Sequence, residues 1–210
     1  MKIEDLRQRI SHCMSERRFK HTLGVESSAA MIAEVILPER VSEIRIAALL
    51  HDLTKELPTA VQRDIMERLS PPPTESDIMT HPLYHSMTAP YVILRDFPEL
   101  ATPDVLSAVK NHTVGAADMS LFDEIIFVAD YIEEGRTYCD CVNARDSFLR
   151  AMQEAKSPDD LVMSLHETTV KILNNTITYI VNNNMFLNER TVTTRNAFLG
   201  RIPVPLKKEY

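Results

Sequence analysis

Residues 46–52 read Ile46-Ala47-Ala48-Leu49-Leu50-His51-Asp52, a run of apolar residues that ends in an imidazole and a carboxylate. Apolar spacing indicates an amphipathic helix from about Val41 to Glu56, closed by Pro58. Neighbouring helical side chains diverge by about 100°, yet a long imidazole and a short carboxylate can still converge on a pair of cations. By itself the dipeptide is more typical of a solvated helix end. Other residues of the chain are therefore needed to distinguish a solvated surface pair from a metal site.

The remaining sequence is also helical in character. Only four glycines occur, and β-branched residues rarely alternate with polar ones, so signals for strands and hairpins are nearly absent. We therefore expect an all-α fold, with one helical domain over residues 1–210, a loop from Pro71 through Asp77 and an irregular tail from about Asn183. Besides the helix at 41–56, helices are predicted at residues 3–10, 23–35, from Pro82 onward, 105–112, 121–132, 144–155 and 160–182.

Composition and charge narrow the classes of function. No apolar run approaches the ~18 to 20 residues needed to span a bilayer, and the charged residues 1–10 do not form a signal peptide, so a cytoplasmic protein is expected. A formal net charge of -7 argues against general nucleic-acid binding, but is compatible with a small anionic substrate held through metal ions. Cys13, Cys139 and Cys141 are interpreted as reduced thiols, since no second cysteine pair or nearby histidine completes a zinc site.

Asp130 is a charged residue inside a run of mostly apolar residues. It lies within Ile125-Ile126-Phe127-Val128-Ala129-Asp130-Tyr131-Ile132, where an unpaired buried carboxylate would cost several kcal/mol. Such a carboxylate needs a cation, unless it lies on an exposed stripe and pairs with a surface lysine. His21, His85 and His112 are also flanked by apolar residues. With His51 and Asp52, these residues would supply the nitrogen and oxygen ligands of a two-metal site.

The chain resembles a known family, the YqeK-type HD-domain hydrolases, over nearly its whole length. Two departures stand out: Ser86 occupies a position where the family usually has glycine, and Glu134 one where it usually has proline. Neither removes a candidate ligand. The matching segments are Arg18-Phe19-Lys20-His21-Thr22, Ala48-Leu49-Leu50-His51-Asp52-Leu53-Thr54-Lys55-Glu56-Leu57-Pro58, Leu83-Tyr84-His85, Asn111-His112-Thr113-Val114-Gly115, Met119-Ser120, Phe127-Val128-Ala129-Asp130-Tyr131-Ile132-Glu133 with Arg136, Thr191-Val192 and Arg195-Asn196.

The resemblance implies an HD-type helical bundle with a two-metal centre. It also implies symmetrical hydrolysis of diadenosine tetraphosphate to two molecules of ADP by a metal-activated hydroxide. The metals would be divalent or mixed-valence transition-metal ions, usually iron, for which manganese or cobalt can substitute. Asp52 would bridge them. The ligand set carried over by motif is His21, His51, Asp52, His85, His112 and Asp130.

Further residues are candidates for contact with phosphate. Lys55 follows the His-Asp pair by one turn and Arg136 lies just beyond Asp130, so both could neutralise polyphosphate oxygens. From position alone either could instead be a helix-end charge or a surface salt bridge, and the resemblance favours the site for both. Thr113 and Gly115 lie in a tight loop that could offer a hydroxyl and backbone amides to phosphate. The candidate catalytic residues are Asp52, Lys55 and Arg136.

Three histidines remain outside this set. His81 stands four residues before His85, but Pro82 suggests that it caps the helix, so it is a reserve ligand only. His12 and His166 lie outside any motif and are interpreted as surface or packing residues.

Two other functions stay open. The same metal chemistry could act on a nucleoside monophosphate, a deoxynucleotide or guanosine tetraphosphate, because metal ligands fix the reaction class while pocket walls fix the substrate. A non-catalytic nucleotide-binding module is less favoured, since it has no need of a hydrolytic metal pair. The expected partner is a small-molecule nucleotide, and the sequence leaves open whether the chain forms a homodimer.

Overall fold

The computed structural model of the chain describes residues 1–203, which contain α-helices and short 3-10 helices but no strand. The all-α prediction is therefore confirmed. None of the described helices is both long and apolar enough to cross a membrane. The α-helices are α1 (Ile3–Ser11), α2 (Glu16–Ile36), α3 (Val41–Leu50), α4 (Thr59–Met66), α5 (Glu75–Met79), α6 (Tyr84–Asp96), α7 (Pro103–Asn111), α8 (Leu121–Ile132), α9 (Cys139–Glu154), α10 (Pro158–Asn182) and α11 (Glu189–Leu199).

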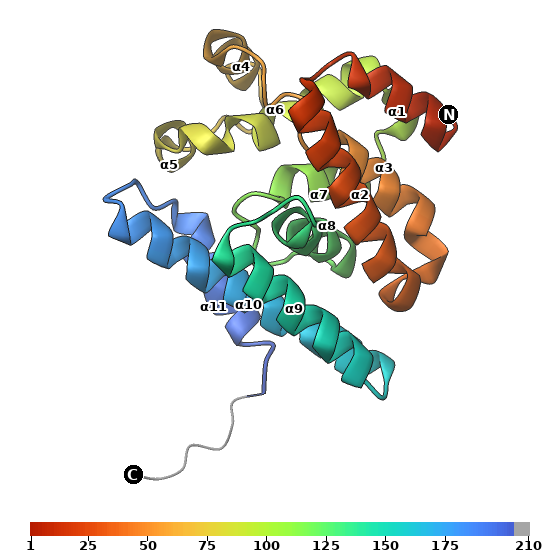
Figure 1. The fold of residues 1–210 in the computed structure, drawn as a ribbon. Coiled ribbons are helices and arrows are strands. Elements are labelled where there is room, and N and C mark those ends of the chain that lie inside the picture. Colours follow the sequence, from red (N-terminus) through yellow and green to blue (C-terminus); the bar gives the residue numbers. More distant parts are fainter. Residues whose placement is uncertain (204–210) are drawn as a thin grey trace.

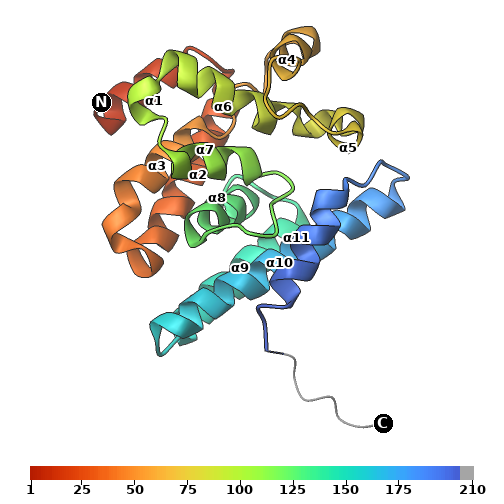
Figure 2. The same cartoon turned by 180° about the vertical axis from the view of Figure 1, so that it is seen from behind.

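Helix α8 occupies the middle of the bundle, where both views show it nearly end-on with other helices around it (Figures 1 and 2). It packs against α2, α3, α7, α9 and α10. Nine of its twelve residues are buried, and a helix that is apolar on most sides needs neighbours all round. Its start is fixed by a capping box, in which Ser120 and Asp123 each accept a hydrogen bond from the other's backbone N–H.

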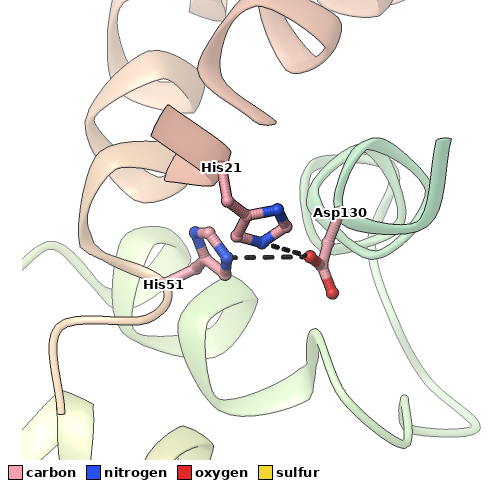
Figure 3. Close-up of side chains that lie close together, drawn as sticks. All are labelled: His21, His51 and Asp130. Atoms are coloured by element: carbon pink, nitrogen blue, oxygen red, sulfur yellow. Dashed lines mark ion pairs between the residues drawn. The ribbon is translucent and has the colours of Figure 1, made fainter. Parts of the chain in front are cut away.

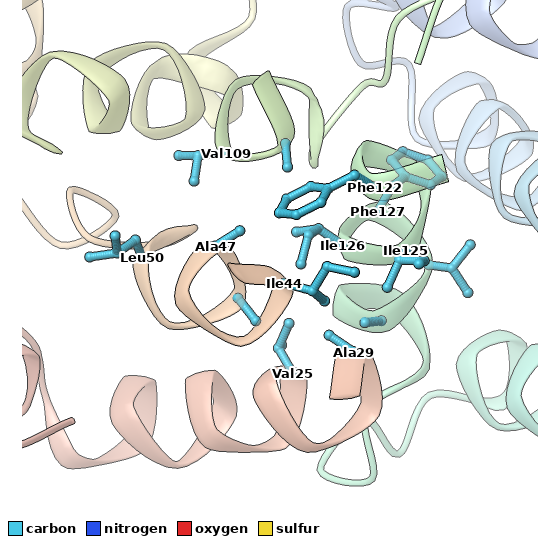
Figure 4. Packing of buried hydrophobic residues seen from close by; sticks show 14 of the residues in the cluster. Val25, Ala29, Ile44, Ala47, Leu50, Val109, Phe122, Ile125, Ile126 and Phe127 are labelled. Carbon is cyan, nitrogen blue, oxygen red and sulfur yellow. The ribbon is translucent and has the colours of Figure 1, made fainter. Parts of the chain in front are cut away.

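The core between α2, α3, α7 and α8 holds the centre of the molecule together (Figure 4). Val25, Ile44 and Ile126 are fully buried there, and burial of each such side chain stabilises the fold by roughly 1.5 to 3 kcal/mol. Ala29 and Ala47 are small enough to let the α2 and α3 backbones come close. The apolar run of α3 is thus fixed in the core, which places the residues that follow it at a defined point.

Helix α3 ends at Leu50, so the prediction that it continues to Glu56 was wrong. The chain continues instead as turns, whose hydrogen bonds join residues three positions apart. Lys55 N donates to Asp52 O at 3.0 Å and Leu57 N to Thr54 O at 3.1 Å. The Thr54 hydroxyl donates to the backbone oxygen of His85 at 2.8 Å. This tie to α6 is a long-range contact that helical periodicity does not reveal.

Helix α5 begins inside the predicted loop from Pro71 through Asp77, so that prediction was wrong for residues 75–77. A capping box made by Thr74 and Asp77 begins it. That box is a local signal which the proline run before it obscured.

The prediction of an irregular tail from about residue 183 was wrong for residues 189–199, which form α11. The side chain of Asn188 caps this helix by accepting a hydrogen bond from Arg190 N at 2.9 Å. Arg190 pairs with Asp77 at 2.7 Å, and Phe198 is fully buried. The helix therefore depends on contacts with distant residues. The end of the predicted tail, residues 204–210, lies outside the described residues.

A buried ion cluster joins the first three helices and provides a test of the fold. Glu26 of α2 is 1% exposed and accepts hydrogen bonds from Arg7 of α1 at 2.8 and 2.9 Å and from Arg45 of α3 at 2.9 Å. Both arginines keep partial contact with water, which limits the cost of removing their charged partner. Glu26→Gln should therefore lower the free energy of unfolding by about 1 to 3 kcal/mol, measured by urea denaturation.

Glu34→Gln is the matched control, because Glu34 lies on the same helix but is exposed. Its effect should stay within about 0.5 kcal/mol. Equal urea midpoints for the two variants would contradict a stabilising role of the Glu26 cluster.

Candidate metal centre

The histidines and aspartates singled out in the sequence come together from separate helices. Their positions are the second turn of α2, the turn that follows α3, the start of α6, the end of α7 and the last turn of α8. Most of these side chains are buried, and none is fully exposed. In this order they are His21, His51 with Asp52, His85, His112 and Asp130.

Asp52 lies between two sets of imidazoles. Its Oδ2 is 3.3 Å from His51 Nε2 and 3.6 Å from His21 Nε2. Its Oδ1 is 3.1 Å from His85 Nε2 and 3.7 Å from His112 Nε2. The two oxygens of one carboxylate, only 3% exposed, therefore face different donors.

Each set has a further short contact. On the first side His21 Nε2 lies 3.0 Å from Asp130 Oδ1, and His51 Nε2 lies 3.8 Å from the same oxygen (Figure 3). On the second side the Nε2 atoms of His85 and His112 are 2.9 Å apart. Two groups of three ligand atoms lie within 4.8 Å of one another: His21, His51 and Asp130, and His51, Asp52 and His112. The arrangement could hold metal ions on both sides of Asp52.

Two of the rings are oriented by their own helices. His51 Nδ1 lies 2.6 Å from the backbone oxygen of Ala48, and His112 Nδ1 lies 2.7 Å from that of Val109. A carbonyl oxygen only accepts, so Nδ1 carries a proton in both rings and Nε2 is the nitrogen that faces the centre. This is the tautomer and the hydrogen bonding that metal-binding histidines use.

Unpaired buried atoms also indicate a cation. His21 Nε2, His51 Nε2 and Asp52 Oδ1 are buried without a hydrogen-bond partner. The 3.0 Å approach of His21 Nε2 to Asp130 is short, but it is not aligned as a hydrogen bond. Buried polar atoms are nearly always satisfied, so two unpaired nitrogens beside one oxygen of Asp52, and the unpaired second oxygen itself, fit a site for metal.

The electrostatics of the histidines differ across the centre. Burial lowers the pKa of His85 to about 3 and also lowers the pKa of His112, so both rings stay neutral, as metal ligands must be. Burial also opposes charge on His21, but the adjacent Asp130 and Glu133 raise its pKa to about 9. The carboxylates on that side require a positive charge, which a proton or a metal ion can supply.

Both aspartates are held ionised. Burial alone would raise the pKa of Asp52, but His51 and His112 beside it keep that pKa well below its usual range. Burial acts in the same direction on Asp130, where Arg136 and His21 lower the pKa well below the ordinary value.

Lys55 and Arg136 reach the centre from opposite sides. Lys55 Nζ lies 3.2 Å from both ring nitrogens of His85, and burial lowers the pKa of this lysine. Helix α8 ends at Ile132 and the chain turns back, so that Arg136 Nη2 meets Asp130 Oδ1 at 2.7 Å and Nε donates to Asp130 O at 3.0 Å. Both residues therefore border the cluster.

Thr113 and Gly115 have different positions. The Thr113 hydroxyl lies 3.2 Å from His112 Nε2 and 3.3 Å from His85 Nε2, so it borders the centre. Gly115 is buried at φ +72°, and its N–H donates to Asn111 O at 2.8 Å. This amide is therefore satisfied within the protein, and a contact of the Thr113 to Gly115 loop with phosphate stays a prediction. Glycine is needed there for the left-handed turn and for the close approach of Thr194.

Sequence reasoning missed Arg18 as a site residue. Its Nη1 lies 2.7 Å from Asp52 Oδ2. A signal was available, because Arg18 precedes His21 by three residues and so shares its helix face.

Glu133 was missed as well. Its Oε1 lies 3.0 Å from His21 Nδ1, and its Oε2 accepts from Gly135 N at 2.6 Å. Gly24 of α2 makes room for it, since a Cβ at that position would collide with the Glu133 carboxylate. No local pattern could reveal this contact, because it joins residues 112 positions apart.

The other histidines lie away from the cluster. His81 Nε2 is 3.0 Å from Thr59 Oγ1, and the ring packs edge-on against Tyr84. His12 is exposed. His166 contacts the buried carboxylate of Glu124 at 2.9 Å, so it packs the interface of α8 and α10.

Comparison with known proteins agrees with this geometry. The chain is 30% identical over 189 residues to the "Bis(5'-nucleosyl)-tetraphosphatase, symmetrical" of Halalkalibacterium halodurans, covering 89% of this chain and 91% of that protein. It is 24% identical over 200 residues to the Staphylococcus aureus protein of the same name, covering 94% and 95%. A crystal structure of a predicted HD superfamily hydrolase involved in NAD metabolism, from Clostridium acetobutylicum, superposes with a TM-score of 0.81 at 28% identity and covers 96% and 98% of the two chains.

The family model described as "HD domain" matches residues 18–135. This segment is more than half of the 210 residues and contains all six clustered histidines and aspartates. The chain therefore belongs to the HD-domain family of hydrolases, as the arrangement around Asp52 and the relatives together establish.

Proposed function

We propose that the chain hydrolyses diadenosine tetraphosphate symmetrically to two molecules of ADP, with a pair of transition-metal ions as cofactor. The observation that carries the proposal is the position of Asp52, whose two buried oxygens face two different sets of histidines. The relatives named as symmetrical tetraphosphatases, at 30% and 24% identity, support the choice of substrate.

The proposed ligands follow the two sides of Asp52. His21, His51 and Asp130 would hold one ion, and His85 and His112 the other, with Asp52 between them. Imidazole nitrogens and carboxylate oxygens suit iron, manganese and cobalt alike, so supply as well as ligand type selects the metal. We propose iron as the physiological metal.

Bound metal ions would polarise phosphoryl oxygens and lower the pKa of a coordinated water. The protein groups around them position the phosphate chain. The Arg136 guanidinium is held in place by two hydrogen bonds to Asp130, and the Lys55 ammonium lies against the His85 ring. Both groups would donate hydrogen bonds to phosphate oxygens at the edge of the centre. Arg18 holds Asp52 in position through its 2.7 Å contact.

Removal of Asp52 tests the metal centre. Asp52→Ala should bind less than about one tenth of the wild-type metal and lose nearly all turnover, because it removes the carboxylate between the two histidine sets. Metal content is measured by elemental analysis, and helix content by circular dichroism should be unchanged. His81→Ala, a histidine outside the cluster, should retain both metal and activity. Wild-type metal content in Asp52→Ala would refute the proposed ligand set.

The products of hydrolysis test the position of cleavage. Protein loaded with iron, manganese or cobalt, given diadenosine tetraphosphate, should release ADP alone, and chelator-treated protein should release nothing. Equal amounts of ATP and AMP would contradict symmetrical cleavage. Parallel incubations with nucleoside monophosphates, deoxynucleotides and guanosine tetraphosphate determine whether another nucleotide is preferred.

Arg136→Lys tests the role of the guanidinium. Lysine can keep the charge near Asp130 but cannot donate from a fixed fork to Asp130 and phosphate together. Metal content should stay unchanged while kcat/KM falls about 10- to 100-fold, or roughly 1.4 to 2.7 kcal/mol of transition-state stabilisation. Steady-state kinetics equal to wild type would place Arg136 outside the reaction.

A further inference from the structure

A second pocket adjoins the candidate metal centre and shares Arg136 with it. The pocket has a volume of about 360 Å³, within the range of small-molecule sites. It is formed where the end of α8, the start of α9 and the last third of α10 meet. The lining residues that matter here are Tyr131, Arg136, Tyr138, Asp140, Asn175 and Tyr179.

Exposed aromatic side chains are concentrated in this pocket. Among residues 1–203 only Tyr138, Tyr179 and Phe186 are aromatic and exposed, with 75%, 61% and 48% of their surfaces accessible. Two of the three line the pocket. Their rings stabilise the fold little where they stand, because so much of their surface remains in water. They are free to stack against a planar ligand.

Polar groups complete the wall. Asn175 and Tyr179 lie four residues apart on α10 and so share one face. The Asn175 amide donates to the Tyr131 hydroxyl at 3.4 Å, and the exposed Asp140 carboxylate can accept a hydrogen bond from a ligand. Stacking faces with a few hydrogen-bonding groups are the features that recognise an unpaired nucleobase.

We propose that this pocket binds the base of one nucleotide half of the substrate, stacked on Tyr138 and Tyr179, while the attached phosphates contact Arg136. The placement of the phosphates rests on the proposed function, whereas the base-binding pocket rests on its own walls. Arg136 lies in both places, because it lines the pocket and pairs with Asp130. A nucleotide whose base lies in the pocket can therefore place its phosphates against Arg136, at the edge of the metal centre.

The cavity on the other side of Arg136 has a different chemistry. It measures about 550 Å³ and lies against α2 beside His21. It shares Tyr138 with the first pocket, and its other exposed walls include the cations Arg17 and Lys20 together with Glu134. Such walls suit phosphate oxygens more than a neutral base. Tyr131, Asn175 and Tyr179 line the first pocket and not this cavity, so the first pocket is the better site for the base.

The test compares two ligands that differ by the nucleoside. ADP and pyrophosphate are titrated by calorimetry into metal-loaded wild-type protein and into the Tyr138→Ala/Tyr179→Ala double variant. Loss of stacking should weaken ADP binding about 5- to 30-fold, because a stacked base contributes on the order of 1 to 2 kcal/mol. The Kd for pyrophosphate should change less than about twofold, since no phosphate contact is removed.

Three controls keep the result interpretable. Phe186→Ala removes an exposed aromatic ring outside this pocket and should leave both affinities unchanged. Tyr138→Phe/Tyr179→Phe retains the rings and should retain ADP affinity within about twofold. Metal content shows that each protein is loaded, and the Tyr179→Ala single variant serves if the double variant does not fold.

The possible outcomes separate this proposal from the proposed function. Equal loss of ADP and pyrophosphate affinity, or no loss of either, overturns the base pocket even if diadenosine tetraphosphate is cleaved. A wild-type protein that binds ADP no more tightly than pyrophosphate overturns it as well. A selective loss of ADP affinity supports the pocket even if diadenosine tetraphosphate is not the substrate.

Discussion

The structure depends on the need to neutralise one buried carboxylate. Asp52 is ionised and almost inaccessible to water, and four imidazoles and an arginine surround it. A charge of this kind would destabilise an apolar interior by several kcal/mol without partners. The helices that meet at Asp52 must therefore be held at fixed positions. The close-packed core of α2, α3, α7 and α8 provides that rigidity directly beside the site.

Helix termini contribute to the site in a way that follows from backbone hydrogen bonding. The last carbonyl groups of a helix lack partners within the helix. His51 and His112 each occupy the position just after a helix and fold their Nδ1 back onto the carbonyl three residues earlier. One short-range contact thus satisfies a terminal carbonyl and fixes the ring. The nitrogen left over points away from the helix and towards Asp52.

Local sequence predicted the parts of the site that have local causes. Asp130 stood out because a carboxylate interrupts an apolar run, and the helix predicted at 23–35 ends one residue before the end of α2. The six candidate ligands identified from the sequence do cluster in space. Helix α11 could not be predicted in this way, because it packs on α10 and its Arg190 pairs with Asp77, more than a hundred positions away. The same limit applies to Glu133, whose partner His21 is equally remote.

Gly24 makes the metal centre sensitive to substitution at a position outside the ligand set. The residue has no side chain and is not itself a candidate ligand, yet the space beside its α-carbon is filled by the Glu133 carboxylate that contacts His21. Any larger residue there would displace Glu133 and rotate the imidazole without touching it. Substitution of Gly24 is therefore restricted by the need to keep the His21 imidazole, one helical turn away, in its orientation. A loss of metal in a natural variant could thus arise from a residue that no list of ligands would include.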